Sequence, residues 1–348
     1  MILVTGGAGF IGANFVRDWL AQEDEPVVNL DKLAYAGSLA SLEGLLHDPR
    51  HVFVKGDVAD SALLARLLES HRPRAVVHFA AQSHVDRSIL HPEDFIQTNV
   101  VGTFRLLEAV RAYWLAQDAG AREHFRFLQI STDEVYGSLP PEAAPVDESG
   151  AYAPRNPYSA SKAAGDHLVR SYHCTYGLPV LTTNCSNNYG PFQFPEKLIP
   201  RILLQALEGK PLPIYGDGLQ VRDWIHVSDH CRAVRAVLEK GLPGRAYNIG
   251  GNCERTNLSV VHEVCRLLDR LSPRGDGAPY ARQITHVEDR MGHDRRYALD
   301  AGRLREELGW QPLESFEAGL EKTVRWYLAH PGWVAELLGK SAATNVIN

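Results

Sequence analysis

The sequence has few cysteines, and their spacing argues against two common classes of stabilised protein. Among 348 residues there are five cysteines, and none of them form the C-x-x-C spacing typical of zinc ligands. They are also too sparse for a disulfide framework. We therefore expect no metal site, and reduced thiols favour a cytoplasmic setting. The five are Cys174, Cys185, Cys231, Cys253 and Cys265.

Long apolar runs and an excess of basic residues are also missing. No stretch approaches the roughly eighteen apolar residues of a membrane-spanning helix. The chain opens at Met1 without the charged leader of a signal peptide. The formal net charge is -6, so there is no basic field for nucleic acid. We expect a cytoplasmic protein that binds neither membrane nor nucleic acid.

A glycine-rich segment lies near the N-terminus. It separates a predicted strand, Ile2 to Thr5, from a predicted helix, Ala13 to Leu20, and its residues 6–12 match the spacing G-x-G-x-x-G. Glycines there allow a tight turn and a close approach of the backbone to a pyrophosphate. A flexible turn would explain the glycines alone. The strand before them and the helix after them favour a dinucleotide site.

Two acidic residues at strand ends bear on which dinucleotide binds. Asp31 follows a predicted strand at 26–30 and stands nineteen residues after Gly12, where a carboxylate can accept both hydroxyls of an adenosine ribose. Such a carboxylate repels a 2′-phosphate, which favours NAD over NADP, although Lys32 weakens this preference slightly. Asp57, after the predicted strand His51 to Lys55, could face an adenine amino group. For either residue the alternative is an ordinary loop aspartate.

Short apolar runs alternate with helical patterns up to about residue 185. Strands are predicted at 2–5, 26–30, 51–55, 75–79, 127–130 and 179–183. This alternation indicates the α/β fold class, a doubly wound parallel sheet of the Rossmann type with a smaller mixed α/β domain after it. We predict a dinucleotide-binding domain at 1–185, a substrate domain at 186–330 with some segments returning to the first sheet, and a tail at 331–348.

A long helix is predicted from Asp94 to Trp114. Its apolar residues follow a helical spacing that would bury one face of the helix. The residues on that face are Phe95, Val100, Phe104, Leu107 and Val110.

Tyr158 and Lys162 are candidate redox residues. Asn156 and Pro157 predict a turn into a helix, on which residues four apart share one face. An ammonium about 6 Å from the phenol would lower its pKa by roughly two and prepare it for general-base duty. A lone Y-x-x-x-K pattern is common by chance, so the surrounding segments must support this interpretation.

Support comes from the segment just before that helix. The predicted strand Phe127 to Ile130 ends at Ser131 and is followed by Thr132, Asp133 and Glu134. Ligands of parallel sheets bind at the carboxyl ends of strands. Adjacent acidic residues are usually solvated, but an acid and a base beside a redox pair suit an elimination reaction.

Further polar segments follow in the second half of the chain. The run 184–191 is rich in amides that could bind sugar hydroxyls or only form a turn. Tyr215, in the predicted loop 209–216, is placed to contact a flat base. Arg222 and the charged loop 289–296 suit a diphosphate. The alternative for both is a solvated charge cluster.

Three motifs carry a resemblance to a known family. They are Thr5–Gly12, Ser131–Gly137 and Tyr158–Lys162. With these motifs the chain resembles the extended short-chain dehydrogenases/reductases that act on nucleotide sugars. The similarity covers nearly the whole chain and is less marked beyond Pro331. Two departures are Met291, where the family has proline, and Gln82, where some members have glutamate.

The resemblance implies two sets of binding residues and a homodimer formed by the helix near Asp94 to Trp114 and the Tyr158 helix. NAD would be held by Gly6, Gly9, Phe10, Ile11, Gly12, Asp31, Lys32, Leu33, Ala34, Asp57, Val58, Phe79, Ala80, Ala81, Ser83, Thr98, Tyr158, Lys162 and Asn188. The nucleotide sugar would be held by Ser83, Thr132, Asn187, Lys197, Leu198, Pro213, Tyr215, Arg222, Asn257, Asp289 and His293.

The implied reaction is the dehydration of dTDP-glucose to dTDP-4-keto-6-deoxyglucose, a step in deoxysugar biosynthesis of the dTDP-rhamnose type. Tyr158, supported by Lys162 and Thr132, would remove the 4-hydroxyl proton during oxidation at C4. Glu134 would then take the C5 proton, and Asp133 would protonate the leaving 6-hydroxyl.

Two alternatives stay open at this point. One is a nucleotide-sugar epimerase or decarboxylase with the same redox pair, and the other is an NAD-sensing protein without catalysis. An epimerase has no need of an acid and a base at 133 and 134. The identity of the nucleobase rests on overall similarity alone.

Overall fold

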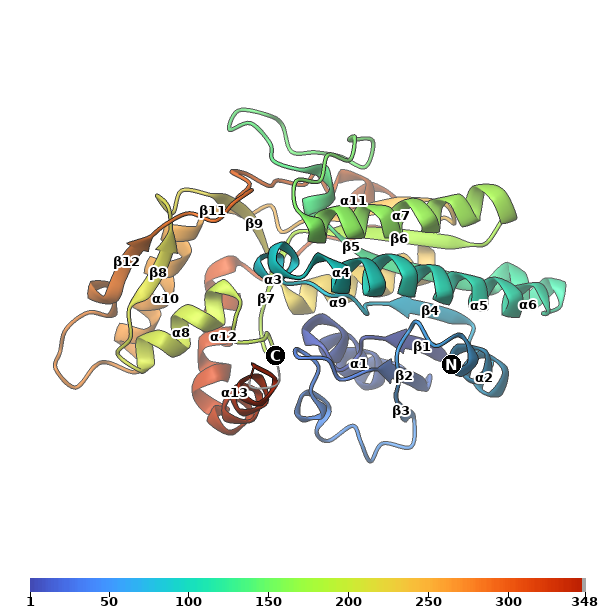
Figure 1. The fold of residues 1–348 in the computed structure, drawn as a ribbon, viewed down its shortest axis with the longest axis horizontal. Coiled ribbons are helices and arrows are strands. Elements are labelled where there is room, and N and C mark those ends of the chain that lie inside the picture. Colours follow the sequence, from blue (N-terminus) through green and yellow to red (C-terminus); the bar gives the residue numbers. More distant parts are fainter. Residues whose placement is uncertain (346–348) are drawn as a thin grey trace.

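The structure, a computed structural model that describes residues 1–345, is built around a parallel sheet of seven strands (Figure 1). The strand order is β10-β6-β5-β4-β1-β2-β3, so the chain winds outward from β1 in both directions. This confirms the predicted doubly wound sheet. The strands are β1 (Ile2–Thr5), β2 (Val27–Asp31), β3 (His51–Lys55), β4 (Ala75–His78), β5 (Arg126–Thr132), β6 (Val180–Cys185) and β10 (Ala246–Ile249).

Helices cover both faces of this sheet. Ile2 and Val4 point into one apolar core and Leu3 into the other, because successive strand residues face opposite sides. The first core includes residues of α1 (Phe10–Gln22), α9 (Val227–Lys240) and α11 (Gly302–Leu308). The second includes residues of α2 (Ser61–His71), α5 (Thr103–Leu115) and α7 (Pro157–Tyr176).

The helix that carries Tyr158 begins and ends for local reasons. The Asn156 side chain accepts the backbone N–H of Ser159, and the Ser159 side chain accepts the backbone N–H of Asn156, which forms a capping box. Pro157 occupies the first helical position, where its missing N–H is not needed. Gly177 ends α7 with a φ of 71°. The predicted turn and helix are confirmed.

The predicted helix from Asp94 to Trp114 is wrong in detail. The chain forms α4 (Pro92–Phe95), then a π-helical segment η2 (Ile96–Gly102), and then α5. The wider π-helical turn changes the rotational register of the residues that follow. As a result Phe104 is 39% exposed and Val100 is half-buried, whereas Phe95, Leu107 and Val110 are buried as predicted.

Residues after β6 form a third apolar core with small sheets of their own, at the left of Figure 1. One sheet has the order β11-β9-β7 and the other pairs β12 with β8. The strands are β7 (Asn187–Tyr189), β8 (Leu212–Tyr215), β9 (Val221–His226), β11 (Glu254–Thr256) and β12 (Ile284–Val287). The helices are α8 (Leu198–Leu207), α10 (Asn257–Leu271), α12 (Phe316–Ala329) and α13 (Pro331–Asn345).

Two predictions for this part need correction. Residues 212–215 form strand β8, not a loop, because they pair with β12. Residues 331–345, predicted only as part of a tail, form helix α13, and its Trp333, Val334 and Leu337 are buried in this third core. The remaining short elements are α3 (Val85–Leu90), α6 (Ala119–His124), η1 (Leu39–Leu42), η3 (Asp133–Tyr136) and η4 (Tyr280–Gln283).

The division of the chain at residue 185 stays a prediction. Strand β10 comes from the second half and pairs in parallel with β6 of the first sheet. Helix α9, also from the second half, shares the core of α1. Within residues 1–345, no helix has both the length and the apolar character needed to cross a membrane.

Candidate active site

A cavity of about 290 Å³ opens at the carboxyl ends of the central strands. It is bordered by residues at the ends of β1, β2, β4, β5 and β6, where a doubly wound sheet binds its ligands. Most predicted cofactor and catalytic residues meet here. Those lining this larger cavity are Gly6, Gly9, Phe10, Ile11, Gly12, Asp31, Lys32, Ala34, Val58, Phe79, Ala80, Ala81, Ser83, Thr98, Thr132, Asp133, Glu134, Tyr158, Lys162, Asn187, Asn188 and Lys197.

The glycine-rich turn is shaped for a close ligand. Gly6 has a φ of 74°, and a Cβ atom there would lie 2.5 Å from the backbone nitrogen of Ala80. A Cβ on Gly12 would lie 2.2 Å from the carbonyl oxygen of Gly6. Helix α1 begins at this turn, and its N-cap residue Gly9 offers no side-chain acceptor to the first helical amides. These amides are suited to bind a pyrophosphate.

Asp31 is held rigidly at the rim of the larger cavity. Its carboxylate accepts the backbone N–H of Ala8 at 2.9 Å and that of Leu33 at 2.7 Å, one on each oxygen. Each oxygen keeps a further lone pair for a ribose hydroxyl. Burial raises the pKa of Asp31, and the two backbone donors oppose that rise. The geometry fits the adenosine ribose of NAD.

Two predicted cofactor residues do not line the cavity. The Asp57 side chain lies 3.3 Å from the ammonium of Lys32, which also donates to Thr98 at 3.4 Å. Leu33 contributes its backbone N–H to Asp31. Both residues contact residues that line the cavity, Lys32 and Asp31.

Thr132, Asp133 and Glu134 lie where β5 ends and η3 begins. The Thr132 hydroxyl donates to Asp133 at 3.1 Å and accepts the backbone N–H of Glu134 at 3.2 Å. Asp133 is only 4% exposed, and its second oxygen has no hydrogen-bond partner. Burial, followed by the Glu134 carboxylate, raises the pKa of Asp133 well above its usual range. Asp133 therefore favours its protonated form, which can act as an acid.

Tyr158 and Lys162 share one face of α7 and line the larger cavity with these acids. The Lys162 ammonium donates to the carbonyl of Ile130 at 2.7 Å. The predicted lowering of the Tyr158 pKa is wrong for the polypeptide by itself, because burial, followed by the Glu134 carboxylate, raises the pKa of Tyr158 well above its ordinary value. Burial and the Glu134 charge outweigh the effect that the spacing of Tyr158 and Lys162 predicts.

A second, smaller cavity of about 180 Å³ adjoins the first. Both cavities are lined by Glu134, Asn187, Glu196 and Lys197, so the two cavities meet at these residues. Lys197 donates to the carbonyl of Ser83 at 2.8 Å. The predicted substrate residues of the smaller cavity are Asn187, Lys197, Leu198, Pro213, Tyr215, Arg222, Asn257 and His293.

Arg222 is a buried cation in the wall of the smaller cavity. Its guanidinium donates to the carbonyl of Asp294 at 2.9 Å and lies 4.3 Å from the ring centre of Tyr297. The Tyr297 hydroxyl in turn donates to the Asp294 carboxylate. Burial lowers the pKa of Arg222. A forked, fixed cation of this kind suits a phosphate group.

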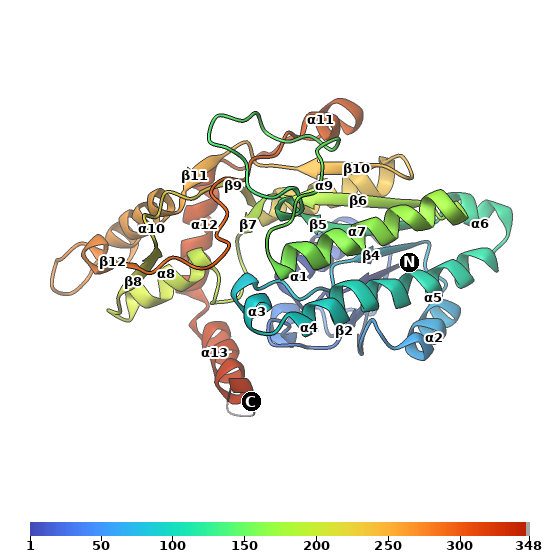
Figure 2. The same ribbon diagram turned by 45° about the horizontal axis from the view of Figure 1, so that its top comes forward.

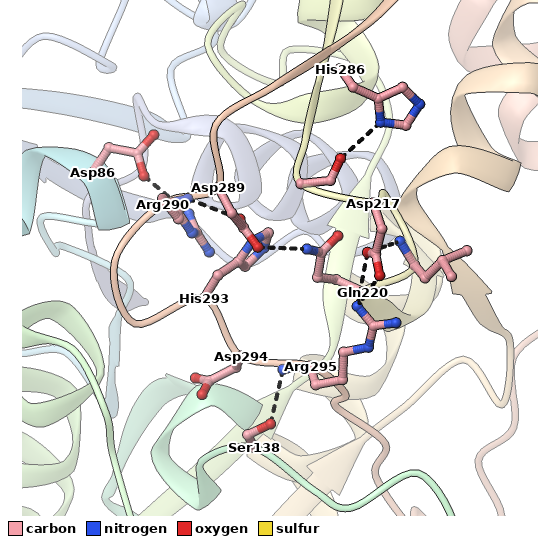
Figure 3. A network of polar contacts seen from close by, with 12 residues as sticks. Asp86, Ser138, Asp217, Gln220, His286, Asp289, Arg290, His293, Asp294 and Arg295 are labelled. Carbon is pink, nitrogen blue, oxygen red and sulfur yellow. Dashed lines mark hydrogen bonds and ion pairs between the residues drawn. The ribbon is translucent and has the colours of Figure 1, made fainter.

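The charged loop 289–296 lines this cavity through Arg290 and His293. Figure 3 shows the polar contacts of the loop. Asp289 lies 2.6 Å from Nδ1 of His293 and accepts Gln220 at 3.1 Å. Arg290 donates to Asp86 at 3.1 Å. Asp289 itself does not line the cavity, so its contribution is to orient His293. Met291, the departure from the family pattern, is exposed.

Several cavity residues escaped sequence reasoning. In the larger cavity they include Tyr35, Ser131, Cys185, Gln193, Phe194 and Glu196. In the smaller one they include Arg201, Trp224 and Tyr297. Glu196 could have been predicted from the sequence, because it directly precedes Lys197, a predicted substrate residue. Tyr35 had none, because only the fold brings its hydroxyl within 2.9 Å of Glu196.

Comparison with known proteins agrees with this geometry. The family model described as GDP-mannose 4,6 dehydratase matches residues 3–323. A dTDP-glucose 4,6-dehydratase from Xanthomonas campestris is 60% identical over 339 residues, which cover 97% of this chain and 96% of that relative.

Solved structures give the same result. The dTDP-glucose 4,6-dehydratase DesIV from Streptomyces venezuelae, crystallised with NAD, is 46% identical with a TM-score of 0.88, and the match covers 97% of this chain and 99% of that chain. A UDP-glucose 4-epimerase from Thermotoga maritima is 28% identical with a TM-score of 0.83, covering 95% and 99%. The chain therefore belongs to the dTDP-glucose 4,6-dehydratase family of the extended short-chain dehydrogenases/reductases.

Proposed function

We propose that this protein is an NAD-dependent hydro-lyase that converts dTDP-glucose into dTDP-4-keto-6-deoxyglucose, a step in deoxysugar biosynthesis of the dTDP-rhamnose type. One observation supports this proposal above others. A buried Asp133, whose pKa is raised by burial, and the carboxyl group of Glu134 line the same cavity as Tyr158 and Lys162. Removal of water needs an acid and a base beside the group that oxidises the sugar.

The residues around the larger cavity fit NAD. The glycine-rich turn and the start of α1 would hold the pyrophosphate, and Asp31 would accept the adenosine ribose hydroxyls. Thr98, Asn188 and Lys162 would hold the rest of the cofactor. When bound, NAD would supply the acceptor for the C4 hydride and the donor of that hydride to C6.

The first step assigned to the chain is proton removal from the sugar 4-hydroxyl. Tyr158 acts as the base, and the Thr132 hydroxyl, which lowers the pKa of Tyr158 by hydrogen bonding, assists it. Lys162 supports the phenolate from the same helical face. Oxidation at C4 makes the C5 hydrogen acidic, which prepares the elimination.

The carboxyl groups carry out the elimination. Glu134 takes the C5 proton, and Asp133 protonates the departing 6-hydroxyl, which leaves as water. Asp133 is suited to the acid role because burial keeps its pKa high. Glu134 is suited to the base role because it lines both cavities and so reaches the sugar between them.

The smaller cavity would hold the nucleoside diphosphate. The buried Arg222 and the half-buried Lys197 face it as cations for the diphosphate, and Tyr215 offers a ring for the base. Leu198, Pro213, Asn257 and His293 complete the wall, and Ser83 and Asn187 lie toward the sugar.

An epimerase of the same fold is the alternative function. The fold alone does not distinguish the two, since the Thermotoga maritima epimerase matches with a TM-score of 0.83. The acid and base at 133 and 134 favour the dehydratase, because an epimerase returns the hydride to C4 and removes no water. A protein that only senses NAD has no use for these groups.

Product analysis and three variants test the proposal. Mass spectrometry of the wild-type product should show the loss of one water from dTDP-glucose. Glu134→Gln and Asp133→Asn should still oxidise C4, so NADH absorbance should accumulate, while elimination slows by roughly 10²–10⁴-fold. Tyr158→Phe should produce no NADH. Near wild-type turnover in both carboxylate variants would contradict these roles.

We further propose that the protein is a cytoplasmic homodimer. Helices α5 and α7 lie side by side on the outside of the molecule in Figures 1 and 2. Ile96 and Phe104 on this side, and Tyr176 at the end of α7, are partly exposed although apolar or aromatic. A second copy of the chain would cover them in a four-helix interface.

A further inference from the structure

Helix α7 carries a third ionisable group below the cavity. Asp166 lies one turn after Lys162 on the same helical face and is 4% exposed. It does not line either cavity, so it makes no contact with the cofactor or the sugar expected there. A buried carboxyl group outside the ligand site requires another explanation.

The Asp166 carboxyl group is surrounded by hydrogen-bond donors. The Ser131 hydroxyl donates to Oδ2 at 2.5 Å, the Tyr152 hydroxyl donates to the same oxygen at 3.2 Å, and the Gln129 amide donates to Oδ1 at 3.4 Å. A hydroxyl bond this short is typical of a charged acceptor. Donors on both oxygens stabilise the ionised carboxylate. Burial raises the pKa of Asp166, and the Lys162 ammonium and these three donors oppose that rise.

Lys162 is buried one helical turn before Asp166, and the Asp166 carboxylate favours its charged form. Burial lowers the pKa of Lys162, and the groups that oppose this effect are Asp166 and Cys185. Burial raises the pKa of Cys185 to about 12, so the thiol carries no charge at neutral pH. Asp166 is then the negative charge that supports the ammonium.

From this arrangement we infer that Asp166 is a positioning residue for C4 oxidation, the buried counter-charge that keeps Lys162 protonated beside Tyr158. The inference rests on the proposed function, in which Lys162 supports the phenolate. Asp166 acts only through Lys162 and moves no proton itself. Its loss should therefore change the pH range of the reaction more than the positions of the catalytic groups.

Other ionisable groups near the pair do not titrate in the relevant range. Burial lowers the pKa of His78 to about 3. Burial raises the pKa of Tyr136 and Tyr152 above the ordinary value of tyrosine, so both stay neutral. The groups facing Lys162 and Asp166 are Tyr158, Cys185, His78, Tyr136 and Tyr152. Between pH 7 and 10, loss of the Lys162 proton would therefore set the alkaline limit.

The test is the pH dependence of kcat/KM with dTDP-glucose for purified protein carrying its NAD. In Asp166→Asn, the alkaline limb should move to lower pH by about 1 to 3 units, and activity should return on acidification. Tyr152→Phe is the control, because it removes a hydrogen bond to the carboxylate but keeps the charge. The alkaline limb of the pH profile of Tyr152→Phe should stay within roughly 0.3 pH unit of the wild-type limb.

The possible failures can be told apart. If the wild type removes no water from dTDP-glucose, the proposed function fails before any variant is compared. If Asp166→Asn turns over more slowly at every pH but its alkaline limb does not move, Asp166 is merely structural and the inference is overturned. Asp166→Ser also removes the charge and carries the same prediction, in case the asparagine variant does not fold.

Discussion

Asp133 and Glu134 are adjacent in the chain, yet their surroundings differ. Asp133 points into the protein. One of its oxygens accepts a hydrogen bond from the Thr132 hydroxyl, and the other has no hydrogen-bond partner. Glu134 is half-buried, accepts the amide of Asn156 at 3.3 Å and lines both cavities. Two carboxyl groups in different environments can serve as acid and base at the same pH.

The raised pKa of Asp133 predicts a gain in stability when Asp133 is replaced by a residue that cannot ionise. Above pH 3.8, its ordinary pKa, the unfolded chain loses the Asp133 proton while burial lets the folded protein keep it. Unfolding then releases a proton, so wild-type stability falls as pH rises. Asp133→Asn has no such proton. Its advantage in urea unfolding should grow by up to about 1.4 kcal/mol per pH unit between pH 5 and pH 8.

A fully exposed aspartate provides the control. Asp24→Asn, on a side chain in solvent, should show no comparable growth of stability with pH. If Asp133→Asn and the wild type differ by a constant free energy over this range, the buried-acid assignment is contradicted.

Asp31 predicts both the choice of cofactor and a cost on removal. Denatured wild-type protein should release NAD and not NADP, because the carboxylate repels a 2′-phosphate.

Asp31→Ala leaves the buried backbone N–H groups of Ala8 and Leu33 without acceptors. Each loss costs about 1–3 kcal/mol. Denaturant unfolding should show this loss of stability, and the variant should carry no bound NAD. Release of NADP from the wild type would contradict the role assigned to Asp31.

At the scale of elements, two loops meet over the larger cavity. Tyr35 comes from the loop after β2 and Glu196 from the loop before α8, and their side chains are 2.9 Å apart. Tyr35 also lies edge-on to Phe194 at 5.5 Å, with the Arg87 guanidinium 4.0 Å from its ring. Both loops line the cavity, so this contact restrains its wall.

Tyr35→Phe should accelerate the release of NAD. The variant removes the hydrogen bond to Glu196 and keeps the ring contacts, a loss of about 1 kcal/mol or roughly fivefold in rate. The release is measured as the exchange of bound NAD. The released NAD is reduced to NADH, and the fluorescence of NADH is followed over time. Tyr113→Phe removes a hydroxyl that bonds the carbonyl of Pro73, far from the cavity, and should not change it. Equal rates in both variants would exclude a role for the loop contact.

At the scale of the whole molecule, the side formed by α5 and α7 predicts the assembly. Light scattering at micromolar concentration should give twice the chain mass. Phe104→Asp places a charge on this side, where burial of an unpaired charge is unfavourable, and should shift the mass toward the monomer. Leu313→Asp, at another exposed apolar position, should not. A wild-type monomer would contradict the proposed dimer.

Much of the site could be predicted because its residues come in short runs. The glycine turn, Thr132 to Glu134, and the Tyr158 helix each have local signals, and all line one cavity. The pKa of Tyr158, the π-helical change of register at Phe104 and the contact of Tyr35 with Glu196 had none. These depend on neighbours that are distant in sequence.

The sequence by itself determined the order of strands and helices, the choice of NAD and the candidates for the catalytic groups, because local periodicity and short motifs encode them. Only the tertiary structure decided which carboxyl group is buried with a raised pKa, which donors surround Asp166, and where the two cavities join. Burial and the distances between charges produce those properties, and both arise when segments far apart in the chain pack together.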